Sequence, residues 1–365
     1  MKLSVLDLIP VRSRQSSAQA ITATTALARL ADSLGYTRYW FAEHHNMPAV
    51  ASTNPAVLAA AIAVQTSRIR IGSGGVMLPN HSPLVIAEQF AALEAIAPGR
   101  VDLGIGRAPG SDPIITSLLH LSGTVSDVDR FPNNVTDVAA LLSPEGASLQ
   151  LRSGDVYSIA ATPAATERPT LWLLGSSDYS ARLAAQLGLP YVFANHFSGE
   201  GLERALSLYR EGYQPSELFP APHTFLTANV VAADSTDEAE ARALPQLHSM
   251  ARLRTNQPLG ALETVEQAES EPLPPAAQAV ADEMHGRWIV GDAASAASAV
   301  RTLGERYGVD EIMVLPVAGS RESEPLDRTP GRERTLELLA GELPDGESLD
   351  GESLDGDRLG RVHSG

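Results

Sequence analysis

The sequence predicts an α/β protein, a (β/α)8 TIM barrel with insertions at the C-terminal ends of its strands. Strand-like and helix-like apolar runs alternate regularly along the chain. The strand-like runs are apolar on both faces, as parallel strands covered by helices must be. Eight such strands fit a closed barrel better than an open sheet, although the pattern alone does not exclude an open doubly wound sheet.

The first half of the chain contains four regular β/α units. Its strands are predicted over residues 2–8, 37–43, 69–78 and 99–106. Its helices are predicted over residues 18–35, 54–66 and 82–97. Gly35 suits a left-handed cap at the end of the first helix. Asn54 and Pro55 are typical of a helix start, as cap and first helical residue.

The second half repeats this order less cleanly. Strands are predicted over residues 170–175, 191–195, 224–233 and 309–316. Helices are predicted over residues 178–188, 199–212 and 292–308. Together the two halves supply the strands that a closed barrel of eight requires.

Three stretches break the alternation. Residues 107–169 and 245–288 are long connections rich in Pro, Gly and polar residues, and such insertions form lids and substrate walls in barrels. Residues 341–365 contain a tandem GESLD repeat with little to bury, so we expect a disordered acidic tail. Residues 1–340 are then expected to form a single barrel domain.

Composition excludes several functions. The net charge of −17 and the pI near 4.9 disfavour nucleic acid as a partner. The absence of cysteine rules out disulfides, zinc–thiolate sites and thiol nucleophiles, and the single lysine, Lys2, makes Schiff-base chemistry improbable. No apolar run is long enough to span a membrane, and the first residues do not resemble a secretory signal. We therefore expect a cytoplasmic protein.

Two adjacent histidines, His44 and His45, follow the second predicted strand in "YWFAEHHNMP". They could form a metal site, form an acid/base pair, or combine one working histidine with one structural neighbour. Side chains that share a strand face are separated by two residues, so adjacent histidines point in opposite directions. This spacing disfavours a metal site, and we expect one histidine to face the barrel mouth. Such a residue is as often structural as catalytic.

The segment "GIGRAPGS" (104–111) follows the fourth strand. It is not a dinucleotide fingerprint, because it precedes a loop instead of opening a helix and lacks the third glycine. Arg107 lies where the strand ends. Its guanidinium suits an anion or an electron-rich ring, and a structural ion pair is an equally good reading.

The segment "LLGSSDYSARLAAQ" (173–186) joins a predicted strand end to a helix start. Gly175 ends the strand, and the hydroxyls of Ser176, Ser177 and Ser180 gather at the first helical turn. Backbone N–H groups at a helix N-terminus together with hydroxyls form a phosphate-binding site. An ordinary serine cap would also explain the pattern.

Taken together, these motifs resemble the bacterial luciferase-like family of flavin-dependent monooxygenases, in its stand-alone, non-luminescent branch. The resemblance covers most of residues 1–240, is weaker over 107–169 and 241–285, and is absent from the tail. It rests on the segments "MKLSVLDL", "EHH", "IGSGGVMLPNHSP", "APGRVDLGIGR" and "GSSDYSARLAAQ".

The resemblance implies a barrel that binds FMN at the C-terminal strand ends. Reduced FMN from a separate reductase would react with O2, and one oxygen atom would enter a small organic substrate. Secondary metabolism is the setting that the resemblance implies. His44 is implied to assist this oxygen chemistry, with His45 close behind it. The implied cofactor-binding residues are Ser73, Gly74 and Gly75 at the isoalloxazine, and Arg107, Gly175, Ser176, Ser177 and Ser180 at the phosphate. Family members often carry a non-prolyl cis peptide bond in the first of these runs.

Two other functions remain open within this resemblance. One is a deazaflavin (F420)-dependent dehydrogenase of the same superfamily, and the other is a non-catalytic flavin-binding partner subunit. The position of the reactive cysteine of the light-emitting subunit is Gly106 here, so bioluminescence is not predicted. The family commonly pairs through helices after the second and third strands, and the Ala-rich stretch 56–65 predicts a homodimer.

Overall fold

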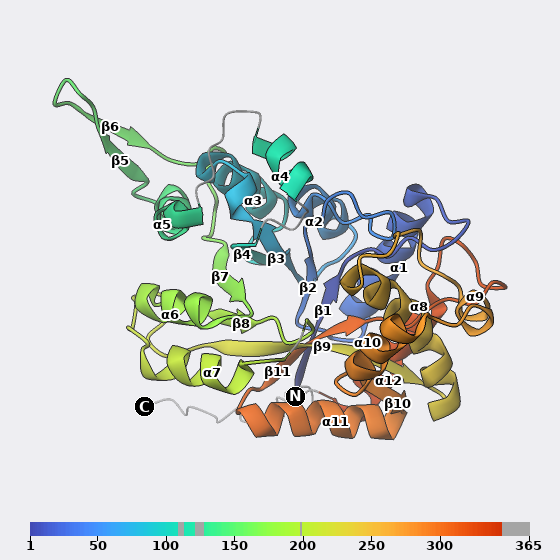
Figure 1. Cartoon of the computed structure of the whole chain (residues 1–365). Coiled ribbons are helices and arrows are strands. Elements are labelled where there is room, and N and C mark those ends of the chain that lie inside the picture. The colour runs from blue at the N-terminus through green and yellow to red at the C-terminus, as the bar shows by residue number, and fades with distance from the viewer. Residues whose placement is uncertain (109–112, 121–127, 198, 345–365) are drawn as a thin grey trace, which may run out of the picture.

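The computed structural model describes residues 1–108, 113–120, 128–197 and 199–344, and its centre is a closed barrel of eight parallel strands (Figure 1). The strands, in order around the barrel, are β1 (Lys2–Asp7), β2 (Arg38–Phe41), β3 (Arg70–Met77), β4 (Val101–Gly106), β7 (Thr170–Gly175), β8 (Tyr191–Phe193), β9 (Thr224–Ala233) and β11 (Glu311–Pro316). The eight predicted strands and the barrel fold are thereby confirmed.

Parallel pairing continues around the whole ring. On one side of β1, Val5 lies opposite Tyr39 of β2, and on the other side Lys2 lies opposite Glu311 of β11. The pairing of β8 with β9 closes the circle. Because all strands run the same way, their C-terminal ends meet at one mouth, where the segments that follow the strands come together.

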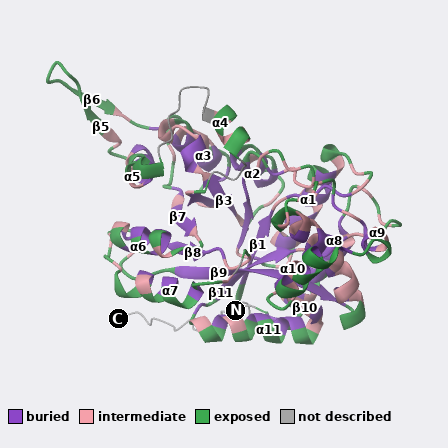
Figure 2. Ribbon diagram, in the orientation of Figure 1, coloured by how far each residue is buried: buried purple, intermediate pink, exposed green. Residues whose placement is uncertain are grey.

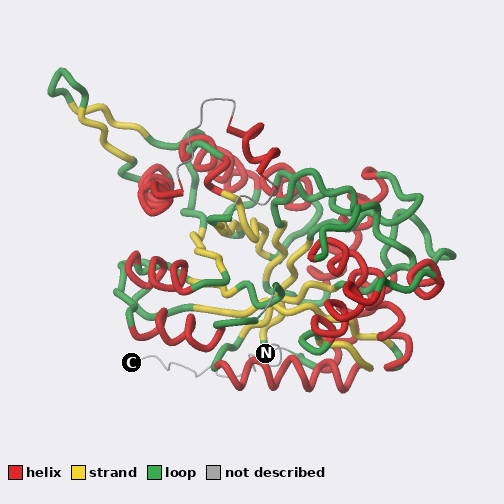
Figure 3. The backbone as a smooth tube through the Cα atoms, viewed as in Figure 1, coloured by secondary structure: helices red, strands yellow, loops and turns green. Residues whose placement is uncertain are grey.

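Helices cover the outside of the barrel (Figure 3). Those that follow the barrel strands directly, or return the chain to the next strand, are α1 (Ser17–Ser33), α2 (Pro55–Ala63), α3 (Pro83–Ile96), α6 (Asp178–Leu187), α7 (Leu202–Glu211), α11 (Ala293–Tyr307) and α12 (Pro330–Glu342). Local signals set their ends: Ser16 and Gln19 form a capping box before α1, Asn54 caps α2, and Gly188 ends α6 in the left-handed region.

The buried apolar residues form an outer layer, a cluster inside the barrel, and a third cluster that joins residues 231–284 with Ala318; Figure 2 shows that the barrel strands are largely buried. The larger layer lies between the strands and the surrounding helices. A smaller cluster includes Leu6, Trp40, Trp172, Phe225 and Met313. Within it, the rings of Trp40, Trp172 and Phe225 pack at centroid distances of 4.9–5.7 Å. These side chains alternate along their strands with those of the outer layer, so they fill the barrel interior.

A buried ionic cluster lies at the opposite end of the barrel from the mouth. Arg38, at the start of β2, donates to Glu311 at 2.6 Å and to Asp102 at 2.8 Å. Arg70 adds a second contact to Asp102 at 2.7 Å. Two arginines thus neutralise two buried carboxylates, which is how charges are kept inside a protein.

The first insertion is more ordered than the sequence indicates. It contains α4 (Pro113–His120), a 3-10 turn (Val128–Arg130), α5 (Phe131–Leu141) and a hairpin of β5 (Ala147–Gln150) and β6 (Val156–Ile159). The hairpin projects away from the barrel (Figure 1). Leu149 of β5 pairs with Tyr157 of β6 in this hairpin. Both side chains are exposed, so the hairpin has no buried face that an alternating apolar pattern in the sequence would reveal.

The second insertion, predicted as an irregular connection, is largely helical. It takes in the second half of α8 (Thr236–Arg254), a helix that begins soon after β9, and contains α9 (Val265–Ser270) and α10 (Pro275–His285). It is followed by β10 (Ile289–Asp292), which extends the sheet beside β9. α8 continues through Pro245, the residue at which the predicted connection begins. Packing of α8 on β9, β10 and α10 compensates for the lost hydrogen bond.

Two boundary predictions differ from the structure or lie beyond it. The tail was predicted from residue 341, but α12 includes residues 341 and 342, while residues 345–365 lie outside the described residues. That residues 1–340 form one domain stays a prediction. Within the described ranges, no helix combines the length and the apolar character that crossing a membrane requires.

Candidate functional site

Two adjoining hollows open at the C-terminal ends of the strands. The Arg107 hollow, of about 1070 Å³, lies against the ends of β3, β4 and β7. The Trp288 hollow, of about 910 Å³, lies between the barrel mouth and the helices of the second insertion. His44, His196, Phe197, Leu6 and Leu8 line both. The two hollows therefore form one bipartite site.

The Arg107 hollow gathers most of the residues predicted for a cofactor. Those on its wall are His44, Gly74, Gly75, Arg107, Gly175, Ser176, Ser177 and Ser180. They come from the ends of four different segments of the chain, which the barrel brings to one mouth. Ser73 and His45 are not among the residues that line this hollow in the described structure.

The N-terminus of α6 forms one end of the Arg107 hollow. Ser177 is its N-cap residue and makes no side-chain cap bond. The Ser180 hydroxyl donates to the backbone oxygen of Ser177 at 2.9 Å and lies 3.3 Å from the Tyr191 hydroxyl. A side chain at Gly175 would collide with Ser180, so glycine lets the strand end approach the helix. Backbone N–H groups of the first turn and the hydroxyls of Ser176 and Ser177 remain available for an anion.

Arg107 lies beside this helix end. Its guanidinium carbon is 4.0 Å from the ring centroid of Tyr179, the second residue of α6. Among the described residues, no carboxylate pairs with Arg107. A stacked guanidinium keeps its N–H groups free along its edges, so Arg107 can bind an anion at the same helix end.

The glycine run of β3 forms a second wall. The Gly74–Gly75 peptide bond is cis, as the family resemblance implies, and the register between β3 and β4 shifts between Gly74 and Val76. A Cβ at Gly75 would lie 2.9 Å from the backbone oxygen of Gly104. Ser73 is fully buried and donates to that same oxygen at 2.8 Å, so its hydroxyl supports the wall from behind.

His44 lies at the junction of the two hollows. Its Nδ1 is buried and has no hydrogen-bond partner among the described residues. Burial lowers the pKa of His44, and the charge of Glu43 offsets only part of that effect. His44 is thus a neutral imidazole that lines both hollows, which suits proton transfer or a hydrogen bond to a ligand.

His45 points to a different partner. Its Nε2 lies 3.0 Å from Oε1 of Glu43, and His81 approaches the same oxygen at 2.8 Å. The backbone N–H of Met77 donates to the other oxygen of Glu43 at 2.9 Å. Burial would raise the pKa of Glu43, but the hydrogen bonds from His45 and His81 lower it to about 2. This ionised carboxylate ties the end of β2 to the end of β3.

His196 belongs to the site but was missed from the sequence. It follows β8, lines both hollows, and places Nδ1 2.7 Å from the Thr227 hydroxyl. Its ring packs against Phe197 at a centroid distance of 4.1 Å. Burial, and then the nearby His44, lower the pKa of His196 to about 3. The sequence did contain one indication of this role: His196 directly follows a predicted strand, and side chains at that place reach the barrel mouth.

Within the described residues, no group of three or more metal-binding side chains is placed to hold a metal ion. The chemistry available is instead that of two neutral imidazoles, an unpaired guanidinium, and a helix N-terminus with hydroxyls. These functions surround the two adjoining hollows.

Comparison with known proteins agrees with this arrangement. The family model described as luciferase-like monooxygenase matches residues 1–311. A protein of Escherichia coli (strain K12) named luciferase-like monooxygenase is 41% identical over 313 residues, which cover 85% of this chain and 90% of that protein.

Solved structures show the same fold. The apo form of MsnO8 aligns with a TM-score of 0.81 at 30% identity, covering 93% of this chain and 98% of the other. The oxygenating constituent of 3,6-diketocamphane monooxygenase from Pseudomonas putida, in complex with FMN, aligns with a TM-score of 0.66 at 18% identity, covering 94% and 97%. From the family match, the identity and the shared barrel, this chain belongs to the luciferase-like monooxygenase family.

Proposed function

We propose that this protein is a flavin-dependent monooxygenase that uses reduced FMN and O2 to insert one oxygen atom into a small organic substrate. The observation that carries the proposal is the Arg107 hollow, where the residues implied for the flavin meet at one barrel mouth. Family membership supports an oxidoreductase. A barrel of the same fold binds FMN.

The residues present fit FMN. The guanidinium of Arg107 and the N-terminus of α6 with Ser176 and Ser177 offer a doubly charged phosphate a cation, backbone N–H groups and hydroxyls. The bare backbone of Gly74 and Gly75 offers a flat surface for the isoalloxazine ring. When bound, reduced FMN supplies the electrons that activate O2.

The chain's own residues would position the reaction. His44 lines both hollows where flavin and substrate would meet, and its neutral imidazole can hold or move a proton there. His196, held neutral by its surroundings and fixed by Thr227, offers a hydrogen bond on the opposite wall. The helices of the second insertion cover the Trp288 hollow and would limit access of water.

Partners follow from the same proposal. The sequence contains no nicotinamide fingerprint, so reduced FMN would come from a separate flavin reductase in a transient encounter. A cytoplasmic location belongs to the proposal, because reductase and nicotinamide are found together there. The organic substrate would enter the Trp288 hollow, and no nucleic acid or membrane is involved.

A stoichiometric oxygen assay tests this function. The purified protein is mixed anaerobically with FMNH2, supplied with ¹⁸O2 and a panel of small organic compounds, and the products are measured by mass. We expect one ¹⁸O atom per product molecule and one O2 consumed per FMNH2. A parallel assay supplies oxidised F420 and an alcohol in place of FMNH2. Reduction of that F420 by the alcohol, without O2 uptake, would instead assign the protein to the deazaflavin-dependent dehydrogenases.

The first testable prediction concerns the phosphate. We expect Arg107→Ala to weaken FMN binding by about 1.5–3 kcal/mol, the usual loss for a hydrogen bond to a charged group. Riboflavin, which lacks the phosphate, should bind equally poorly to both proteins. Arg182→Ala, which changes an exposed arginine on the same helix, is the control and should leave FMN binding unchanged. Titration of flavin fluorescence measures all of these, and equal affinity for FMN and riboflavin would refute the assignment.

A further inference from the structure

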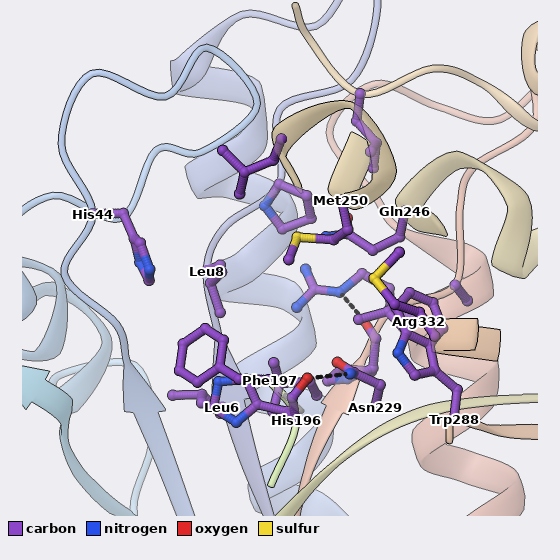
Figure 4. Close-up of a pocket in the computed structure, with 18 of the residues that line it drawn as sticks. Leu6, Leu8, His44, His196, Phe197, Asn229, Gln246, Met250, Trp288 and Arg332 are labelled. Atoms are coloured by element: carbon purple, nitrogen blue, oxygen red, sulfur yellow. Dashed lines mark hydrogen bonds between the residues drawn. The ribbon is translucent and has the colours of Figure 1, made fainter. Parts of the chain in front are cut away.

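The Trp288 hollow has two dissimilar ends (Figure 4). His44 lies on one side, next to the Arg107 hollow. Gln246 and Trp288, from α8 and the segment after α10, lie on the other side. Leu6, Leu8 and Phe197 lie between these ends. The hollow is therefore elongated, and a molecule inside it would present one end to the histidines and the other to Gln246 and Trp288.

The middle of the hollow is apolar and adaptable. Its walls include Leu6, Leu8, Met47, Met250, Leu315 and Met284. Leucine and methionine side chains favour aliphatic groups, and methionine adjusts its shape to irregular ones. An aliphatic chain is the group that such walls bind best.

The charges of this wall favour one kind of ligand. No carboxylate is among its described lining residues, whereas Arg254 and Arg332 are. Arg332 is buried and its charge is neutralised by Asp7 at 2.6 Å. Arg254 is exposed and donates to the backbone oxygen of Phe197. A cationic ligand would meet the charge of Arg254 and no carboxylate among the described lining residues, so the hollow selects against it.

The far end carries hydrogen-bonding groups that the protein does not use. Among the described residues, neither the amide of Gln246 nor the indole N–H of Trp288 has a hydrogen-bond partner. Asn229 donates its amide N–H to the backbone oxygen of His196 at 2.9 Å and keeps its own oxygen free. Two N–H donors that line one largely apolar hollow are suited to a carbonyl oxygen, which accepts hydrogen bonds from both.

From these observations we propose that the Trp288 hollow binds an aliphatic molecule that ends in a carbonyl group, an amide or a carboxylate, with that group held by Gln246 and Trp288. The opposite end of the molecule then lies against His44, where oxygen insertion would occur. This inference rests on the proposed function for the reaction itself, but binding of the molecule does not require flavin.

Trp288 supplies a built-in reporter of binding. The chain has three tryptophans, and the other two, Trp40 and Trp172, are buried in the barrel interior. We would titrate the flavin-free protein with octanamide, octanoate and octylamine, which share one chain length, and record tryptophan emission. Trp288→Phe should abolish the ligand-dependent part of the signal.

The proposal predicts a definite order of affinity for the three probes. Octanamide and octanoate should saturate the Trp288 signal, and octylamine should bind at least about tenfold more weakly. Gln246→Leu, which keeps the side-chain volume, should weaken both carbonyl probes about threefold to tenfold, the range for one lost hydrogen bond. Gln278→Leu, an exposed position on α10 that is bonded only to Asp282, is the matched control and should change nothing.

Each result decides the proposal. No response to either carbonyl probe, octylamine binding as tightly as octanamide, or unchanged affinity in Gln246→Leu would overturn it. FMN binding is measured separately by flavin fluorescence. If FMN binds and the carbonyl probes do not, the inference fails while the proposed function stands. If the probes bind as predicted and FMN does not, the proposed function fails while the hollow keeps its assigned ligand class.

Discussion

The two neighbouring histidines have different surroundings, and these surroundings assign them different tasks. His44 lines both hollows, whereas His45 is bonded to the buried carboxylate of Glu43. Strand alternation predicted that only one of them would face the mouth. It could not reveal Glu43 as the partner of both His45 and His81, because His81 lies in a distant segment of the sequence.

The second prediction separates these tasks. His44→Ala should lower turnover by about 10²-fold or more, the usual effect of losing a general acid or base, while FMN binding stays nearly unchanged. Electrons would then leave as hydrogen peroxide instead of product. His45→Ala should mainly lower the free energy of unfolding. Product yield per FMNH2 and peroxide release are measured for both, and fully coupled turnover in the His44 variant would remove it from the mechanism.

The third prediction concerns pH. His196 has a pKa of about 3 in the folded protein, below the value of about 6.5 for an unfolded chain. Between these values the unfolded state binds one more proton, so the free energy of unfolding falls as pH falls through this window. His196→Asn, which keeps a partner for Thr227, should reduce the slope between pH 4.5 and 6 by about 1.4 kcal/mol per pH unit. Urea unfolding at several pH values tests this, and an unchanged slope would show that His196 is protonated in the folded state.

At the scale of elements, strands were more predictable than the insertions. Parallel strands buried on both faces read as short apolar runs, and all eight were found from that signal. The helices of the second insertion were not, because Pro245 and the prolines near residue 274 indicate chain breaks. Contacts with β9 and β10 override those local preferences, and such contacts are invisible in a single sequence.

The site, too, was predictable only where its residues belong to local motifs. Eight of the ten predicted site residues line the Arg107 hollow, because they belong to motifs that directly follow strands. The Trp288 hollow was not predicted in detail. Its far wall, with Gln246, Met250, Met284 and Trp288, comes from segments whose sequence carries no recognisable motif, and only packing of α8 and α10 over the mouth brings them together.

The fourth prediction is a homodimer through α2 and α3. Val57 of α2 and Val64, the C-cap residue of α2, are 63% and 66% exposed. Val85 and Ile96 of the neighbouring α3 are 46% and 48% exposed. An exposed apolar face on two adjacent helices is typical of a subunit interface. The wild-type protein should sediment as a dimer and the Val57→Glu, Val64→Glu double variant as a monomer. Leu218→Glu, an exposed change in the loop after α7, should remain dimeric; a monomeric wild-type protein would refute the interface.

At the scale of the whole molecule, the barrel separates chemistry from stability. The bipartite site occupies the C-terminal strand ends, while Arg38, Asp102 and Glu311 form the ionic cluster at the N-terminal ends. These three residues are far apart in sequence, and only barrel closure brings them together. Substitutions at the C-terminal ends should therefore affect binding and activity, and substitutions at the N-terminal ends should affect stability.

The last prediction tests that separation. Arg38 is 6% exposed and lies between two buried carboxylates, and its guanidinium also packs 4.8 Å from the Trp172 ring centroid. Arg38→Met should lower the free energy of unfolding by about 3–5 kcal/mol, since it leaves buried negative charge without its partner. At a temperature where the variant stays folded, FMN binding and turnover should be close to wild type. Arg334→Met, which breaks an exposed pair with Asp234, is the control and should cost less than about 1 kcal/mol. An Arg38→Met variant as stable as the wild type would contradict the first part of this prediction. A variant that stays folded but is inactive would show that the two ends of the barrel are not separated in this way.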